Sequence, residues 1–167
     1  MKLYMASSAP KRAAVDTNVM IVANGKDHES GPACILASSR KLRELQNDAV
    51  LLLDTEGEIL KEYKNHMSYA GQPGIGDAFF KWLHDNQAVQ GKVEKINVTK
   101  TGNLFNIVSA RESLQGFDPS DHKFLAVAMT CKDHVDIYNA TDSDWQEYSE
   151  AIEEIENIAV VELCGGT

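Results

Sequence analysis

Short apolar runs alternate with longer amphipathic segments along this chain. Residues 13–22 and 49–53 are largely apolar and have the length of buried strands. Residues 135–138 and 158–163 form two further apolar runs that contain β-branched side chains. The pattern therefore predicts four buried strands.

Other segments carry apolar residues at helical spacing. The predicted helices cover residues 32–45, 58–67, 77–84, 120–129 and 146–155. In the fourth of these, Ser120 is the predicted N-cap and Asp121 lies in the first turn. Residues 91–117 are less regular and predict either a strand pair or an irregular insertion.

Strands that alternate with helices predict an α/β fold, here a three-layer α/β/α sandwich with a largely parallel central sheet. We expect a single domain over residues 1–167, with an insertion or elaboration around residues 90–117. Sites in such folds lie beyond the carboxyl ends of the strands, near the switch in strand order. Asp142 and Asp144 follow a predicted strand, and Asp16 lies in a strand that reaches the same edge.

The composition is that of a globular protein, with 43% hydrophobic and 25% charged residues among 167. The longest apolar run, residues 49–53, is too short to span a membrane, and residues 1–12 contain no apolar leader. Cys34, Cys131 and Cys164 form no CxxC pair, so the sequence predicts neither a disulfide framework nor a thiolate zinc site. We therefore expect a cytoplasmic protein.

The negative charge is concentrated at the end of the chain. The whole chain has a net charge of −9, but residues 133–167 carry −10 and residues 1–132 carry +1. An acidic chain usually argues against a nucleic-acid partner. Because all the basic residues lie in the first part, that argument does not exclude one here. The acidic end has two interpretations, a solvated helix face or a set of carboxylates that hold cations.

Five acidic residues carry the second interpretation. They are Asp16 in an apolar run, Glu62 within a helix, Asp121 at a helix start, and Asp142 and Asp144 after a strand. A buried aspartate is costly unless it is paired or binds a metal, and oxygen-only ligands suit Mg²⁺ or Mn²⁺. The residues other than Asp16 also have a structural interpretation: Asp121 as a first-turn acid, Asp142 or Asp144 as an N-cap, and Glu62 as a solvated helix residue. Asp16 has no adjacent cation in the sequence to pair with it.

Three motifs in order resemble those of the PIN-domain nucleases. They lie at residues 15–19 (VDTNV), 121–128 (DHKFLAVA) and 140–145 (ATDSDW). The resemblance implies that Asp16, Asp121 and Asp142 are metal ligands and that Asp144 is a further carboxylate. It also implies a glutamate on the helix after the second strand, for which Glu62 is the candidate.

The resemblance implies accessory roles as well. Asn18 would orient the site, Thr141 would act beside the late aspartate, and Glu58 is the alternative to Glu62. Substrate phosphates require positive charge nearby, for which Lys11, Arg12 and Lys123 are the candidates.

The function implied is that of a Mg²⁺- or Mn²⁺-dependent endoribonuclease of the toxin or defence type. Its implied partners are RNA, an inhibitory antitoxin whose Arg enters the acidic site, and a second copy in a homodimer. A PIN-like binding module without catalysis is the alternative. Residues 51–57 (LLLDTEG) also resemble the first motif of haloacid-dehalogenase-like phosphatases, with Asp54 as nucleophile, although a plain turn before a helix is the commoner explanation of such a segment.

Overall fold

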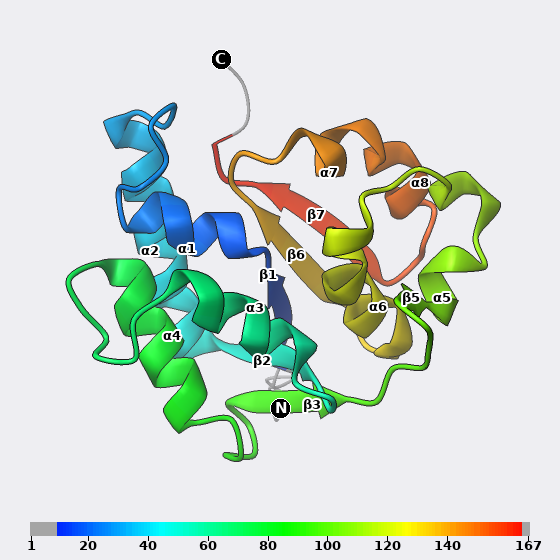
Figure 1. Cartoon of the computed structure of the whole chain (residues 1–167), viewed down its shortest axis with the longest axis horizontal. Helices are drawn as coiled ribbons and strands as arrows, with labels where there is room; N and C mark the ends of the chain where they lie inside the picture. Colours follow the sequence, from blue (N-terminus) through cyan, green and yellow to red (C-terminus); the bar gives the residue numbers. More distant parts are fainter. Residues whose placement is uncertain (1–9, 165–167) are drawn as a thin grey trace, which may run out of the picture.

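A computed structural model describes residues 10–164 and contains a central sheet of five strands (Figure 1). The strands are β1 (Lys11–Val15), β2 (Ala49–Asp54), β3 (Val93–Ile96), β6 (Val135–Asn139) and β7 (Ile158–Glu162). Their order is β3-β2-β1-β6-β7, and every neighbouring pair is parallel. The predicted α/β class is confirmed.

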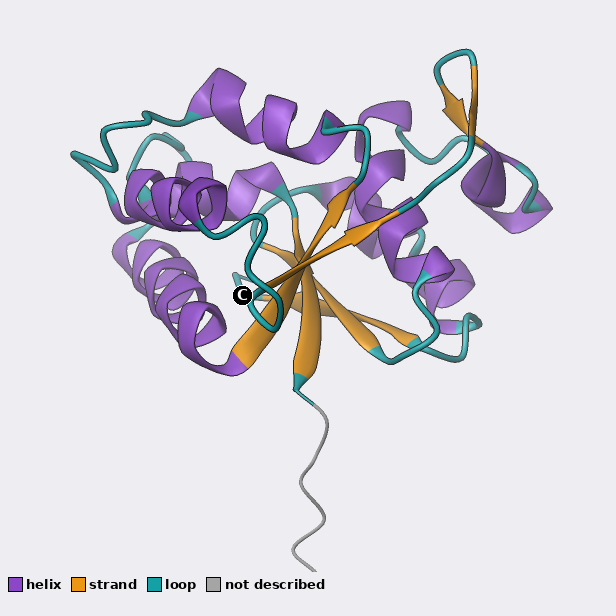
Figure 2. Ribbon diagram, turned by 90° about the horizontal axis from the view of Figure 1, so that it is seen from below, coloured by secondary structure: helices purple, strands orange, loops and turns teal. Residues whose placement is uncertain are grey.

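Helices cover both faces of this sheet, so the fold is a three-layer α/β/α sandwich (Figures 1 and 2). α2 (Pro32–Asp48) lies on one face, together with α1 (Thr17–Ala23) and α4 (Ile75–Asp85). α6 (His122–Thr130) packs on β1, β2 and β6 from the other face, and α8 (Ser149–Glu153) packs on β7. α3 (Glu58–His66), α5 (Asn106–Ser109) and α7 (Ser143–Glu147) complete the α-helices of residues 10–164.

The side of the sheet to which the chain adds new strands changes at β1, the central strand. From β1 the chain moves outward to β2 and β3, and then crosses β1 to build β6 and β7 on the other side. The carboxyl ends of β1 and β6 are therefore neighbours at the switch point, where such folds bind ligands. Asp16 follows β1 and Asp142 lies shortly after β6, so the topology places both residues at this point.

The prediction of a single strand over residues 13–22 is wrong beyond its first residues. The strand ends at Val15, and α1 begins directly afterwards. The cause is local, because the Asp16 side chain accepts a hydrogen bond from the Asn18 backbone N–H and caps α1. Val19 and Met20 are buried, and a helix buried on several sides has the same apolar run as a buried strand.

Residues 91–117 contribute to the sheet and also form a separate hairpin. β3 pairs with β2, so Val93–Ile96 belongs to the central sheet and is not an addition to it. β4 (Lys100–Thr101) and β5 (Leu104–Phe105) pair only with each other, and this hairpin stands apart from the sheet in Figure 2.

Two local predictions near the later helices need correction. Ser120 is not a cap: Asp118 accepts from the Ser120 N–H and caps a 3-10 turn over Pro119–Asp121, after which α6 begins. The helix predicted over residues 146–155 is divided into α7 and α8 at Tyr148.

The structure contains a disulfide that the sequence does not predict. Cys34 and Cys164 are bonded, with 5.0 Å between their Cα atoms, and the bond joins the first turn of α2 to the residues after β7. The two cysteines are 130 positions apart, so only the fold reveals their proximity. A cytoplasmic location was expected because the cysteines form no CxxC pair, and the disulfide means that this reason no longer applies. Cys131 is free and buried.

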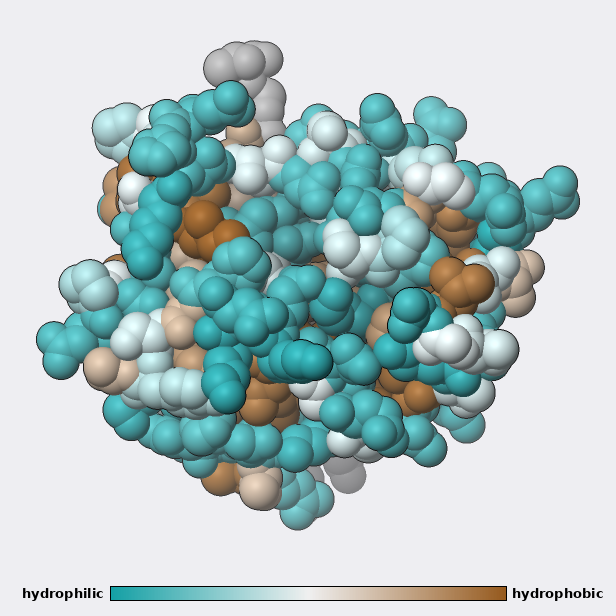
Figure 3. Space-filling model, in the orientation of Figure 1, coloured by the Kyte–Doolittle hydropathy of each residue, from teal (hydrophilic) through white to brown (hydrophobic). Residues whose placement is uncertain are grey.

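The core lies between the sheet and its two helical layers. In the view of Figure 3, hydrophilic side chains predominate and hydrophobic ones reach the surface in separate places. Over residues 10–164, no helix combines the length and the hydrophobicity that a membrane crossing requires. The leader expected to be absent at residues 1–12 falls mostly on residues 1–9, which lie outside the described range.

Candidate metal centre

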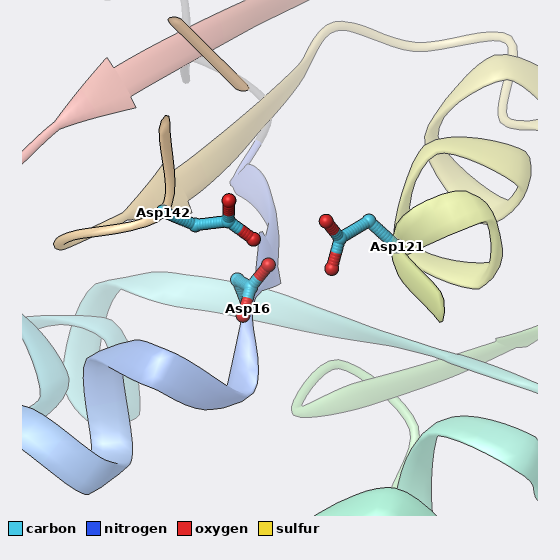
Figure 4. A group of neighbouring side chains, drawn as sticks. All are labelled: Asp16, Asp121 and Asp142. Carbon is cyan, nitrogen blue, oxygen red and sulfur yellow. The ribbon is translucent and has the colours of Figure 1, made fainter. Parts of the chain in front are cut away.

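Three aspartates from distant parts of the chain meet at the carboxyl edge of the sheet. Asp16 precedes α1, Asp121 precedes α6, and Asp142 precedes α7. One carboxylate oxygen from each lies within 4.8 Å of the other two, and Figure 4 shows the three side chains pointing toward one another. Asp16 is 4% exposed and Asp121 is 6% exposed. This cluster of buried acidic residues could bind a metal ion.

Asp16 is held by two hydrogen bonds that use both of its oxygens. Oδ1 accepts from the Asn18 N–H at 3.0 Å, and Oδ2 accepts from the indole N–H of Trp145 at 2.7 Å. Burial raises the pKa of Asp16 to about 6 against the effect of these two bonds, and the charges of Asp142 and Glu62 raise it further. The carboxylate is thus fixed in direction but costly to ionise.

Asp121 lacks such support. Its Oδ2 is buried and has no hydrogen-bond partner among the described residues. Burial, followed by the charges and proximity of Asp16 and Asp142, raises the pKa of Asp121 to about 10. A buried, unpartnered carboxylate oxygen costs free energy, which either a bound proton or a cation relieves.

Asp142 combines a structural contact with its place in the cluster. One of its oxygens accepts from the Asp144 N–H at 2.9 Å and caps α7, as its structural interpretation predicts. Asp144 lies in a second acidic group with Asp118 and Asp121, again with oxygens within 4.8 Å. Burial, followed by the charges of Asp142 and Asp118, raises the pKa of Asp144. Asp121 therefore belongs to both groups.

Glu62 lies at the rim of the three-aspartate cluster rather than within it. It accepts a hydrogen bond from the Thr17 hydroxyl and forms an ion pair with Lys123, whose Nζ is 2.8 Å from Oε1. Glu58 instead pairs with Lys100 of the hairpin at 3.1 Å. Of the two glutamates predicted as alternatives, the structure brings Glu62 to the site and directs Glu58 away from it.

Two predicted accessory residues have different surroundings. Asn18 donates from Nδ2 to Asn139 Oδ1 at 2.8 Å and accepts from the Ala140 N–H at 2.8 Å, so it joins α1 to the loop after β6. Thr141 is exposed and lines a separate open hollow together with Asp27. The structure does not bring Thr141 into the cluster.

The predicted substrate-binding residues Lys11 and Arg12 lie at the opposite edge of the sheet. Both stand at the start of β1, whereas Asp16 follows its end, and a strand advances about 3.3 Å per residue. Arg12 pairs with Glu94 at 2.9 Å and with Asp133 at 3.2 Å. Neither residue can contact a phosphate held at the cluster, and only Lys123 of the three predicted cations is near it.

Asp54 has a structural role that accounts for the phosphatase-like motif. Its two oxygens accept from the Glu58 N–H at 2.9 Å and the Ile59 N–H at 2.8 Å, so it anchors the start of α3. It is 1% exposed and is the last residue of β2, a strand that is not at the switch point. The turn interpretation of this segment describes these contacts fully.

Three further residues support the site. Trp145 belongs to the third motif, but the sequence assigns a role in the site to none of the three. Trp145 orients Asp16, Tyr63 donates from its hydroxyl to the Val15 carbonyl, and Asn139 contacts both Asn18 and Asp142. The Trp145 contact joins residues 129 positions apart, so it depends on the topology. Comparisons with family models, curated proteins and solved structures find no match, and the functional argument therefore stands on the residues themselves.

Proposed function

We propose that this protein is a divalent-metal-dependent phosphodiesterase that cleaves RNA internally. The observation that carries the proposal is Asp121 Oδ2, which is buried and without a partner among the described residues, in a cluster with Asp16 and Asp142. A cation explains why the fold keeps three carboxylates together at the switch point of its sheet. The choice of RNA as substrate comes from the resemblance of the three acidic motifs to PIN-domain nucleases.

The ligand chemistry favours Mg²⁺ or Mn²⁺. All three side chains offer carboxylate oxygens, and these hard donors match small divalent cations better than zinc or copper. When bound, such a cation supplies positive charge to a phosphoryl oxygen and lowers the pKa of a water molecule. Asp16, Asp121 and Asp142 would hold it, while Trp145 and Asn18 keep Asp16 in place.

Lys123 is suited to bind the substrate. It is close to the cluster, its side chain is 13% exposed, and its charge is matched by Glu62. A phosphate that approaches the cluster can share the Lys123 ammonium group with Glu62. Glu62 therefore acts at the rim in this proposal, where it fixes Lys123 and keeps it close to the incoming phosphate.

The biological role that we propose is that of a toxin or defence nuclease with an inhibitory partner. A guanidinium group that entered the cluster would donate to the unpartnered oxygen of Asp121 and neutralise its neighbours. An antitoxin that carries such an Arg would thus inhibit by occupying the place of the cation.

The test is the cleavage of an end-labelled single-stranded RNA with Mn²⁺, with Mg²⁺ and with EDTA. We expect cleavage with either cation, none in EDTA, and none by Asp16→Asn, which keeps the shape of the side chain but weakens the ligand. Asp48→Asn is the matched control, because Asp48 is exposed and lies at the other edge of the sheet. Equal cleavage by Asp16→Asn would contradict the proposal, and a failure to cleave any RNA would favour a binding module.

A further inference from the structure

Asn139, the last residue of β6, uses its whole side-chain amide in hydrogen bonds and is fully buried. Its Oδ1 accepts from Asn18 Nδ2 at 2.8 Å and from the Asp142 N–H at 3.2 Å. Its Nδ2 donates to the Asp142 carbonyl at 2.8 Å and to Glu162 Oε2 at 2.7 Å. Two acceptor and two donor positions are all that an asparagine amide offers. Asn139 therefore links α1, the loop after β6 and the end of β7.

Glu162 is the charged partner among the groups that fix which way this amide faces. An ionised carboxylate only accepts hydrogen bonds, so the amide must present its NH₂ group to Glu162. The same orientation directs Oδ1 to the donors from Asn18 and Asp142. If the amide were reversed, its oxygen would face the carboxylate of Glu162 and the carbonyl of Asp142, and its NH₂ group would face two donors. Glu162 thus disfavours the reversed orientation, together with the carbonyl and N–H groups of Asp142.

Asp142 is held directly by this arrangement. Asn139 binds both its backbone N–H and its carbonyl, so the amide fixes the turn from which the Asp142 carboxylate projects. That carboxylate must point toward Asp16 and Asp121 to join the cluster, as it does in Figure 4. A turn free to rotate would move its oxygens out of this geometry.

We propose that Asn139 and Glu162 are positioning residues of the metal centre, in which Glu162 orients the Asn139 amide and Asn139 holds Asp142 in its ligating position. This inference rests on the proposed function because it assumes a bound metal. The hydrogen bonds of Asn139 and Glu162 do not depend on that assumption. Residues that orient metal ligands in this way typically change metal affinity by about 10- to 100-fold when they are replaced.

The test compares two replacements of Glu162. Glu162→Leu removes the acceptor, whereas Glu162→Gln retains an oxygen that Asn139 can donate to. Glu156→Leu is the matched control, because Glu156 is exposed and lies just before the other end of the same strand. Asn139→Leu is the stronger variant, and the pair at Glu162 decides the question if that variant does not fold.

Two readouts are required, Mn²⁺ affinity by electron paramagnetic resonance and hydrogen exchange of the Asp142 amide without metal. We expect Glu162→Leu to weaken Mn²⁺ binding by about 10- to 100-fold at an unchanged unfolding temperature. Glu162→Gln and Glu156→Leu should bind Mn²⁺ as the wild type does. Exchange at Asp142 should become faster in Glu162→Leu alone.

The outcomes separate this inference from the proposed function. If the wild type binds Mn²⁺, unchanged affinity in Glu162→Leu, or equal weakening in Glu162→Gln, overturns the positioning role. If the wild type binds no Mn²⁺, the proposed function fails, and the exchange of the Asp142 amide then decides the positioning role. Faster exchange in Glu162→Leu but not in Glu162→Gln supports that role, and any other exchange result overturns it.

Discussion

The charged side chains at the two edges of the central sheet are arranged in opposite ways. At the amino edge, Arg12 lies between Glu94 and Asp133 and pairs with both. At the carboxyl edge, Asp16, Asp121 and Asp142 meet, and no described Lys or Arg forms an ion pair with any of them. The first edge brings opposite charges together, whereas the second brings like charges together.

The amino-edge residues stabilise the fold, whereas the buried carboxylates of the carboxyl edge lower its free energy of unfolding when they are ionised. The amino-edge pairs require no partner beyond the chain. The carboxyl edge raises the pKa of Asp16 to about 6 and that of Asp121 to about 10, chiefly through burial, and leaves one Asp121 oxygen unpartnered among the described residues. Such violations of the rules for stable folds are expected at functional sites.

The largest expected effect comes from Asp121→Asn. Loss of this carboxylate should weaken Mn²⁺ binding by more than about 100-fold, because a direct ligand matters more than the groups that orient it. The free energy of unfolding without metal should not fall, because the variant removes a buried carboxyl that the fold ionises only at a cost. Mn²⁺ titration and urea unfolding in EDTA measure the two quantities. A variant that binds Mn²⁺ like the wild type would show that Asp121 is not a ligand.

The next effect concerns the disulfide, which lies at the carboxyl edge beside the end of β7. Reduction by a dithiol should lower the free energy of unfolding by about 2–4 kcal/mol, since the bond closes a long loop of the unfolded chain. Urea unfolding with and without the reductant measures the change. The double variant Cys34→Ser, Cys164→Ser should start at the lower stability and should not respond to the reductant. Equal stability of the oxidised and reduced wild type would refute a stabilising role for the bond.

The pH dependence separates the metal-free site from the loaded one. The folded pKa of Asp16, about 6, exceeds the unfolded value of about 3.9, so the folded state binds more protons between these limits. The metal-free protein should therefore lose stability as the pH rises from about 4 through 6, and Asp121 extends that loss to higher pH. Saturating Mn²⁺ should oppose the loss, because the cation binds the ionised carboxylates.

Urea unfolding at pH 5 and pH 8, in EDTA and in Mn²⁺, tests this pH dependence. Asp16→Asn should show a flatter dependence in EDTA, since one of the titrating groups is absent. A metal-free wild type with a higher free energy of unfolding at pH 8 than at pH 5 would contradict this prediction.

The smallest effect is expected at the amino edge. Arg12→Gln should lower the free energy of unfolding by no more than about 1 kcal/mol, as is usual for partly exposed ion pairs. It should leave both RNA cleavage and Mn²⁺ affinity unchanged, because Arg12 stands at the far end of β1. Loss of cleavage in a folded Arg12→Gln protein would show that the two edges are not independent.

The architecture could be predicted because most of the local patterns agree with the sheet. The alternation of strands and helices is enough for an α/β fold with parallel strands. The error at residues 13–22 has a physical cause, since the apolar residues after Asp16 serve a helix buried on several sides and give no periodic signal. The end of β1 is set instead by the Asp16 side chain, which caps α1.

The same limit applies to the candidate site. Asp16, Asp121 and Asp142 can be named from local motifs, and the strand topology then brings them together. The residues that support these aspartates cannot be named from local motifs. Trp145 reaches Asp16, and Glu162 reaches Asn139, through contacts between distant segments of the chain. Lys11 and Arg12 show the opposite case. They are close to Asp16 in the sequence, but the extended strand β1 separates them from it in space.

The central claim is that the carboxylates at the switch point form a cation site that a proton occupies when the cation is absent. Isothermal titration of Mn²⁺ at pH 7, in two buffers of different ionisation enthalpy, measures the binding and the proton release together. We predict saturable binding with the release of about one proton, because burial beside Asp16 and Asp142 raises the pKa of Asp121 and a cation displaces the proton that this favours. No saturable binding, or binding that releases no proton, would contradict the account.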